Sequence, residues 1–205
     1  MDENKHGMVF KKGQHLFHEN GYATGIYCIN QGKLKLFQTG GEGKEQIVRF
    51  AKEGDVLGYR ALMSGDTLSV SAVALEEVHV CFLPREAFFS VISSENTVSF
   101  EIIKRLSDDL RALQEKVTLL AQKSVRERAA ETLLFLKETF GFEGDNQIIN
   151  VALSREEIAG LIGTATETAI RLLSDFKHEG LIELAGKKIK ILDVKGLVRL
   201  ANMYD

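Results

Sequence analysis

The chain of 205 residues is poor in cysteine, with only Cys28 and Cys81, and it has one proline and no tryptophan. Two cysteines are too few for a disulfide scaffold, and too few for a zinc or iron–sulfur site built from cysteine alone. This usage suits a reducing compartment, so we expect a cytoplasmic protein. No apolar run approaches the ~20 residues that a membrane span needs, and the amino terminus lacks the apolar core of a signal peptide. We therefore expect no membrane partner.

Neither sign of charge dominates, because Lys and Arg total 26 against 29 Asp and Glu, for a net charge of −3. The whole-chain charge therefore gives no indication of nucleic acid or an anionic membrane, and a local patch would have to meet such a partner. The length allows one large domain or two small ones, each able to bury a core.

The first ninety residues are expected to form short strands separated by glycine turns. Residues 33–36 and 45–50 alternate with period two on either side of a glycine-rich turn. Further runs of β-forming residues cover 25–29, 69–75 and 78–83. Pro84 closes this region before a short predicted helix over 85–92. The pattern predicts an antiparallel roll or barrel.

Beyond residue 94 the apolar spacing becomes that of a long helix. Intervals of three and four residues, without Gly or Pro, form the a/d pattern of a coiled coil. The residues concerned are Ile103, Leu106, Leu110, Leu113, Val117 and Leu120. A helix packed on its own domain is the alternative, but such helices normally carry a broader apolar stripe. The pattern favours a parallel helix pair across a two-fold axis, and hence a homodimer.

Two short helices are predicted near the carboxyl end, after a helix over 126–140 and a short strand over 148–153. Ser154 and Glu157 form a capping box that begins the first, and Gly163 ends it. A second capping box, from Thr164 to Glu167, predicts that the next helix begins almost at once. Two helices joined by so short a glycine turn are typical of a helix-turn-helix.

The second of these helices carries the side chains that read DNA base edges. The outward positions are expected to be Ala165, Thr166, Glu167, Ile170, Arg171 and Ser174. Arg suits guanine, Glu suits the cytosine amino group, and Thr suits a thymine methyl. A helical hairpin without a nucleic acid partner is the alternative interpretation.

A hairpin follows the second helix and is expected to form a wing beside it. Residues 181–184 and 188–192 alternate around a turn at 185–187, with lysines suited to phosphates. Residues 177–199 hold six basic and three acidic residues, although the chain from residue 124 onward has a net charge of −2. The full set of expected DNA contacts is Ser154, Arg155, Thr164, Thr166, Glu167, Ile170, Arg171, Ser174, Lys187 and Lys188.

The segment 153–182, LSREEIAGLIGTATETAIRLLSDFKHEGLI, resembles the Crp/Fnr superfamily of bacterial transcription regulators. Residues 12–21, 27–32, 43–45 and 54–58 are similar to that family too. The resemblance implies an α+β fold with a cyclic-nucleotide-binding-like β-roll (1–92), a dimerisation helix (93–123) and a winged helix-turn-helix (124–205). It also implies a homodimer on a pseudo-palindromic operator, a small-molecule effector, and contact with RNA polymerase. Glu167 and Arg171 fall where the family's base-reading residues lie, whereas Thr166 replaces an Arg of the cyclic-AMP receptor protein.

The effector expected from this resemblance is not cyclic AMP. Members that bind cyclic AMP use a Gly-Glu pair for the ribose and an Arg-Ser pair for the phosphate. Here Tyr59 stands at the Glu position, and no Lys or Arg lies between Arg60 and Arg85, so a phosphate would lack its countercharge. The effector pocket is expected at Gly58, Tyr59, Arg60, Thr67 and Ser69. Because no cysteine precedes Cys28, the four-cysteine iron–sulfur cluster of the Fnr branch is not expected either.

Haem or metal ligands remain an open alternative, since three of the histidines in the amino-terminal half could act together with both cysteines. These are His15, His18, Cys28, His79 and Cys81. The simpler interpretation is that both cysteines are buried, because they lie in apolar runs, and that an odd separation places His15 and His18 on opposite faces of a strand. No metal site or cofactor is firmly predicted.

Nothing in the sequence predicts catalysis, because neither the five histidines nor any serine motif suggests a nucleophile with its base. We therefore expect a dimeric DNA-binding regulator rather than an enzyme. The competing hypothesis is a ligand-binding or interaction module whose helix-turn-helix is vestigial.

Overall fold

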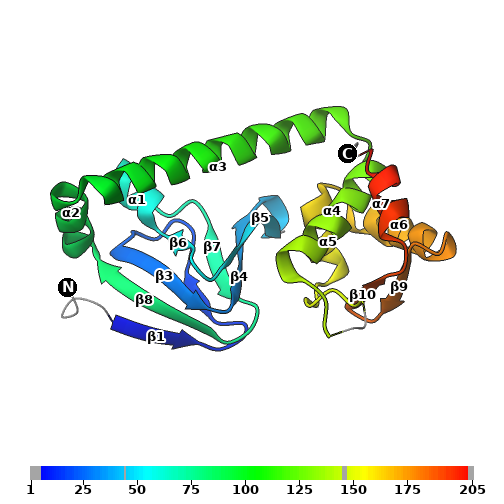
Figure 1. The fold of residues 1–205 in the computed structure, drawn as a ribbon, viewed down its shortest axis with the longest axis horizontal. Coiled ribbons are helices and arrows are strands. Elements are labelled where there is room, and N and C mark those ends of the chain that lie inside the picture. Colours follow the sequence, from blue (N-terminus) through cyan, green and yellow to red (C-terminus); the bar gives the residue numbers. More distant parts are fainter. Residues whose placement is uncertain (1–5, 44, 145–146, 203–205) are drawn as a thin grey trace. The chain divides into compact units, whose positions relative to one another are not determined.

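The computed structural model describes residues 6–43, 45–144 and 147–202, so Lys44, within a segment that carries the family resemblance, lies outside them. The chain divides into two compact units, Met1–Ala112 and Leu113–Asp205 (Figure 1). Helix α3 (Asn96–Gln122) contains the border between them. The combination of antiparallel sheets, a long helix and a carboxyl-terminal helix-turn-helix confirms the predicted α+β fold class.

The first unit is built from two four-stranded antiparallel sheets, ordered β1-β8-β3-β6 and β2-β7-β4-β5. The strands are β1 (His6–Phe10), β2 (His15–Phe17), β3 (Gly25–Gln31), β4 (Lys33–Thr39), β5 (Glu45–Lys52), β6 (Val56–Leu57), β7 (Ser71–Ala74) and β8 (Val78–Pro84), with a 3-10 turn η1 (Gly41–Gly43). Alternate residues such as Leu34, Ile47 and Val78 face the interior and are fully buried. Burial of these side chains therefore holds the two sheets together.

Three helices accompany these sheets: α1 (Tyr59–Ser64), α2 (Arg85–Ser94) and α3. Gly58 precedes α1 with φ 88°, and a Cβ there would lie 2.9 Å from the carbonyl oxygen of Gly25. Only glycine therefore suits this position. A second apolar cluster packs the helices against β3, and it includes Ile26, Tyr59, Leu62, Phe88 and Ile102.

The second unit holds α4 (Val125–Phe140), α5 (Arg155–Ile162), α6 (Thr166–His178), the hairpin β9 (Ile182–Ala185) and β10 (Lys188–Ile191), and α7 (Val194–Leu200). Ser124 and Ser154 form complete capping boxes with Glu127 and Glu157, which begin α4 and α5. The predicted strand over 148–153 is wrong. Residues 148 and 149 make only isolated bridges, to Lys190 and Phe142.

Two further local expectations are wrong. Helix α6 takes Ala165 as its N-cap without a side-chain hydrogen bond, so Thr164 forms no capping box. His15 and His18 do not lie on opposite faces of a strand, because β2 ends at Phe17 and the two rings stack with centroids 4.3 Å apart. Side chains alternate between the two faces only within a strand, and His18 lies outside β2.

Candidate DNA-binding surface and effector pocket

The turn between α5 and α6 is closed by backbone hydrogen bonds to the last carbonyls of α5, mainly that of Ala159. Gly163, with φ 74°, and Thr164 both donate to the Ala159 oxygen, at 2.9 and 3.1 Å. This arrangement satisfies carbonyls at the end of α5, and it uses the Thr164 N–H to end one helix rather than to cap the next. A helix-turn-helix therefore lies where the sequence predicted it.

Arg128 of α4 secures the same turn from inside the second unit. Its side chain is buried and donates to three carbonyl oxygens, those of Lys123, Ile162 and Gly163, at 2.9–3.1 Å. A guanidinium at the carboxyl end of a helix also interacts favourably with the helix dipole. Sequence analysis missed this role, because nothing in the local pattern distinguishes Arg128 from a surface arginine.

Helix α6 separates a buried face from an exposed one. Ala169, Leu173 and Phe176 are fully buried, whereas Glu167 and Arg171 are exposed. Of the other residues predicted to point outward, Ala165 and Ile170 are exposed and Thr166 and Ser174 are half-buried. The helix therefore presents a continuous side-chain surface outside the unit's core.

The hairpin β9–β10 forms a wing whose turn, Gly186 and Lys187, carries an exposed lysine. Arg155 at the start of α5 donates to the Gly186 carbonyl oxygen at 2.8 Å, while its buried Nη1 has no hydrogen-bond partner among the described residues. Lys188 instead contacts both carboxylate oxygens of Glu143 at 2.7 Å. Among the predicted phosphate contacts of the wing, Lys187 is thus the more available charge.

Most of the predicted coiled-coil stripe is exposed on α3. Ile103 and Val117 are 58% and 66% exposed, and Leu110, Leu113 and Leu120 are exposed as well. Leu106 differs, because it packs partly against the cluster beneath α3. Phe100, which is 72% exposed, extends the stripe by one turn toward the amino end of the helix. The sequence pattern, started at Ile103, missed it.

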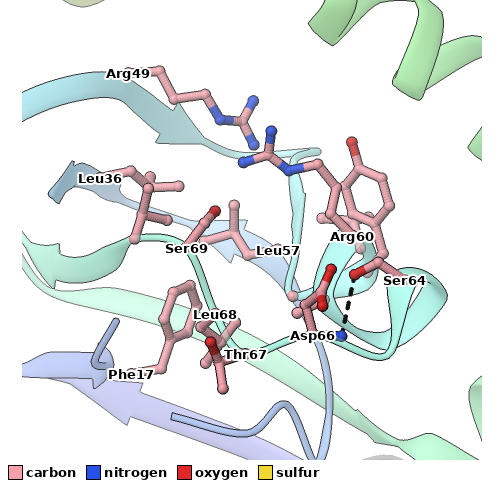
Figure 2. A pocket seen from close by; sticks show the side chains of 15 residues that line it. Phe17, Leu36, Arg49, Leu57, Arg60, Ser64, Asp66, Thr67, Leu68 and Ser69 are labelled. Carbon is pink, nitrogen blue, oxygen red and sulfur yellow. Dashed lines mark hydrogen bonds between the residues drawn. The ribbon is translucent and has the colours of Figure 1, made fainter. Parts of the chain in front are cut away.

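A cavity of about 230 Å³ opens in the first unit beside α1 (Figure 2). All five residues predicted for the effector pocket line it: Gly58, Tyr59, Arg60, Thr67 and Ser69. Arg49 of β5 lines it too, and Figure 2 shows its guanidinium facing that of Arg60. The expectation that an anion would lack a countercharge is therefore wrong. That expectation considered only the positions after Arg60, whereas Arg49, which precedes Arg60 in the chain, supplies the second positive charge.

Tyr59 and Arg49 connect this cavity to α3 through Asp109. The Tyr59 phenol donates to Asp109 Oδ2 at 2.7 Å, and an Arg49 nitrogen lies 3.9 Å from Asp109 Oδ1. The pKa of Tyr59 is raised to about 12, mainly by burial and secondly by the hydrogen bond to Asp109. The phenol is thus held neutral as a hydrogen-bond donor at ordinary pH.

No cluster of three or more His, Cys, Asp or Glu side chains is placed to hold a metal ion within residues 6–43, 45–144 and 147–202. In those same ranges, none of the helices is both long and apolar enough to cross a bilayer.

A β-roll with a charged cavity, a long helix and a winged helix-turn-helix define a DNA-binding regulator with a sensing domain. The family model for the cyclic nucleotide-binding domain matches residues 8–95, and that for the Crp-like helix-turn-helix domain matches 127–200. The chain belongs to the Crp/Fnr family of transcription regulators, and it is not an enzyme.

Relatives and solved structures agree with this assignment. The chain is 33% identical to the transcriptional activator protein anr of Pseudomonas aeruginosa, over 97% of this chain and 81% of that protein. It is 31% identical to the CRP-like cAMP-activated global transcriptional regulator of Mycobacterium tuberculosis, over 94% and 87%. A transcriptional regulator of the CRP family from Thermus thermophilus superposes with a TM-score of 0.81 at 26% identity, covering 95% and 96%.

Proposed function

We propose that this regulator binds a pseudo-palindromic DNA operator as a homodimer, with one α6 in each major groove. The observation that carries the proposal is the exposed surface of α6, where Glu167, Ile170 and Arg171 lie opposite a buried face. Two such helices about one duplex turn (~34 Å) apart would reach both half-sites. Glu167 and Arg171 would read cytosine and guanine edges, with Thr166, Ser174 and Ile170 completing the contact.

Contacts to phosphates would position the reader without reading sequence. We assign these to Ser154, Arg155, Thr164, Lys187 and Lys188, on the turn and on the wing beside it. Lys187 would contribute most because its ammonium is exposed, whereas Lys188 would first have to leave Glu143. Binding would weaken steeply with salt, because each neutralised phosphate releases counterions.

Dimerisation would bury the exposed stripe of α3. Ile103, Leu110, Leu113, Val117 and Leu120 are large apolar side chains left in solvent by a single chain. A second α3 packed in parallel would cover them with knobs-into-holes contacts. The β-roll, dimerisation helix and DNA reader would then correspond to residues 1–92, 93–123 and 124–205, in keeping with family-model matches at 8–95 and 127–200.

The effector would be a small anion other than cyclic AMP, held by Arg49 and Arg60. Arg60 forms no ion pair or hydrogen bond with any residue in the described part of the chain, although its guanidinium faces another positive group. A carboxylate or phosphate between the two would neutralise both through paired hydrogen bonds. Cyclic AMP is disfavoured because Tyr59, committed to Asp109, stands where the ribose-binding Glu is expected.

Occupancy would reach α3 through Asp109. An anion at Arg49 would compete with Asp109 for that guanidinium, and Asp109 lies on the helix proposed as the dimer interface. The ligand would shift the DNA-reading helices only by its differential affinity for two arrangements of the chain, through a pivot near residues 120–126.

We also propose contact with RNA polymerase, which is supported by the activator among the relatives. We propose a cytoplasmic location too, because that is where the DNA lies.

The DNA proposal is tested by selecting bound duplexes from a random pool with the full chain. We expect enrichment of inverted half-sites with centres one helical turn apart. Equal retention of all sequences at every salt concentration would instead support the vestigial helix-turn-helix.

The effector proposal is tested by thermal unfolding at constant ionic strength with inorganic phosphate, succinate or cyclic AMP. We expect phosphate or succinate to raise the midpoint in the natural chain and in Lys52→Gln, but not in Arg60→Gln. Lys52→Gln is the control because Lys52 lies on β5 with Arg49 but does not line the cavity. An equal rise in Arg60→Gln, or a rise with cyclic AMP alone, would contradict the assignment.

A further inference from the structure

The two cysteines of the chain face each other across neighbouring strands. Cys28 of β3 is the direct antiparallel partner of Cys81 of β8. Both are half-buried and neither is in a disulfide. They lie 53 positions apart in a chain that contains no other cysteine. Directly opposed side chains project from the same face of a sheet, so the two thiols are neighbours.

The backbone ladder places the Cα atoms of these residues at a separation that a disulfide can span. Arg85 donates to the Thr24 oxygen, and this pair belongs to the same register as Cys28 and Cys81. Every second pair along an antiparallel ladder is a hydrogen-bonded pair, and Cys28 and Cys81 lie four positions from the pair of Thr24 and Arg85. They are therefore a hydrogen-bonded pair too, with Cα atoms about 5.5 Å apart. The backbone N–H of Ile29 donates to the Asp55 oxygen on the other side of β3. The N–H of the preceding residue, Cys28, therefore points toward β8, which agrees with this assignment. Disulfides span Cα separations of about 4.4–6.8 Å, most often near 5.5–6 Å.

The pair is open to a small oxidant from the side of β1. The partner of Cys81 on that strand is Gly7, which has no side chain. A Cβ built at Gly7 would meet no atom within 4 Å, so the space beside Cys81 is open. On the inner side, Cys28 packs against the cluster that contains Ile26 and Ile102. One thiol is therefore approachable while the other is held next to it.

We propose that Cys28 and Cys81 are a redox-responsive pair that forms a reversible disulfide within one chain when a peroxide is present. The Cys81 thiol attacks one peroxide oxygen and becomes a sulfenic acid, releasing one water. The Cys28 thiol then attacks that sulfur and releases a second water, so that two thiols and one hydrogen peroxide give one disulfide and two waters. In a reducing compartment the thiols would be restored, as for other transient cytosolic disulfides. This site is separate from the proposed DNA surface and effector cavity, and it does not depend on either.

The test is hydrogen peroxide treatment of the full-length reduced chain, followed by peptide mapping without reductant. We expect one intrachain link between the peptides of Cys28 and Cys81, lighter by two hydrogens. Free thiols counted in denaturant should fall from two per chain to none and return to two with dithiothreitol. A link between two chains, or two thiols that survive the treatment, would overturn the proposal.

A matched variant distinguishes neighbouring thiols from two independently reactive ones. In Cys28→Ser the sulfenic acid at Cys81 has no partner, so we expect it to persist and to be trapped by dimedone. In the natural chain the trapped fraction should be several-fold lower. Equal trapping in both chains would show that the two thiols do not react with each other. The peptide map of the natural chain decides the question even if the variant does not fold.

Discussion

The phenol of Tyr59 donates a 2.7 Å hydrogen bond to Asp109, which joins the first residue of α1 to the long helix α3. Tyr59 and Arg49 both line the cavity, and an Arg49 nitrogen lies 3.9 Å from Asp109 Oδ1. The carboxylate is therefore shared between two residues that would surround an effector. Any ligand that moves either one changes what holds α3 against the β-roll.

Tyr59→Phe should destabilise the first unit by about 1 kcal/mol near pH 8, because one hydrogen bond is lost while the ring remains. The pKa of Tyr59 is raised to about 12, whereas an unfolded phenol ionises near pH ~10. Its contribution is thus fully present below about pH 10 and is lost as the pH rises toward 12.

Urea unfolding followed by circular dichroism at several pH values measures this difference. We expect the natural chain and Tyr59→Phe to converge between about pH 10 and 12. Tyr22→Phe is the control, because Tyr22 is 82% exposed and its loss should change little. A gap that stays constant over this range would contradict the role given to the bond.

Arg171→Ala should weaken binding to the selected operator by about 1–3 kcal/mol and relax base preference at one position in each half-site. Because Arg171 is exposed, the free energy of unfolding should not change. Fluorescence anisotropy with single-base variants of the operator measures the affinity and the base preference. Uniform weakening on every duplex would identify Arg171 as a phosphate contact.

Lys187→Ala should reduce the dependence of binding on salt without changing base preference, because its exposed ammonium is assigned to phosphate. Lys188→Ala is the internal comparison, and its effect should be smaller since Lys188 is paired with Glu143. The slope of the logarithm of affinity against the logarithm of salt concentration is the measurement. A larger change for Lys188→Ala would show that the pair with Glu143 breaks on DNA.

Leu113→Asp should separate the dimer, because it places a carboxylate in the middle of the exposed apolar stripe. Ala112→Asp adds the same charge one residue away, on a face outside the stripe, and should leave the dimer intact. Sedimentation equilibrium distinguishes the two. Dimers in both variants, or monomers in both, would contradict the heptad assignment.

Arg128→Leu should destabilise the second unit by about 3 kcal/mol, because three carbonyl oxygens lose their donor inside the unit. Arg171→Ala serves as the control for losing an arginine at the surface. Thermal unfolding measures both. Near-equal midpoints would mean that water replaces Arg128 at the turn.

Sequence patterns predicted most of the architecture because the decisive features are local. The capping box at Ser154, the left-handed Gly163 and the alternation around the wing each depend on a few neighbouring residues. The pocket residues near Gly58 came from family resemblance, and they do line one cavity. Thr164 was misassigned because a cap depends on which residue leaves helical geometry first, and that residue is Ala165.

The features that sequence analysis missed depend on contacts between distant segments. The alternation of residues around Arg49 predicts a strand, but it does not indicate which face of that strand borders the cavity. Asp109 looks like any solvated residue of a long helix until Tyr59 is placed beside it. Cys28 and Cys81 become partners only through the register of β3 and β8, which no local pattern encodes.

Footprinting of the selected operator with the full-length chain tests the central claim most directly. If α6 reads the major groove as part of a dimer, two protected segments should appear, with centres about one helical turn (~34 Å) apart. Leu113→Asp should reduce occupancy of both together. A single protected segment unchanged by Leu113→Asp, or protection that spreads evenly over unrelated DNA, would contradict the account.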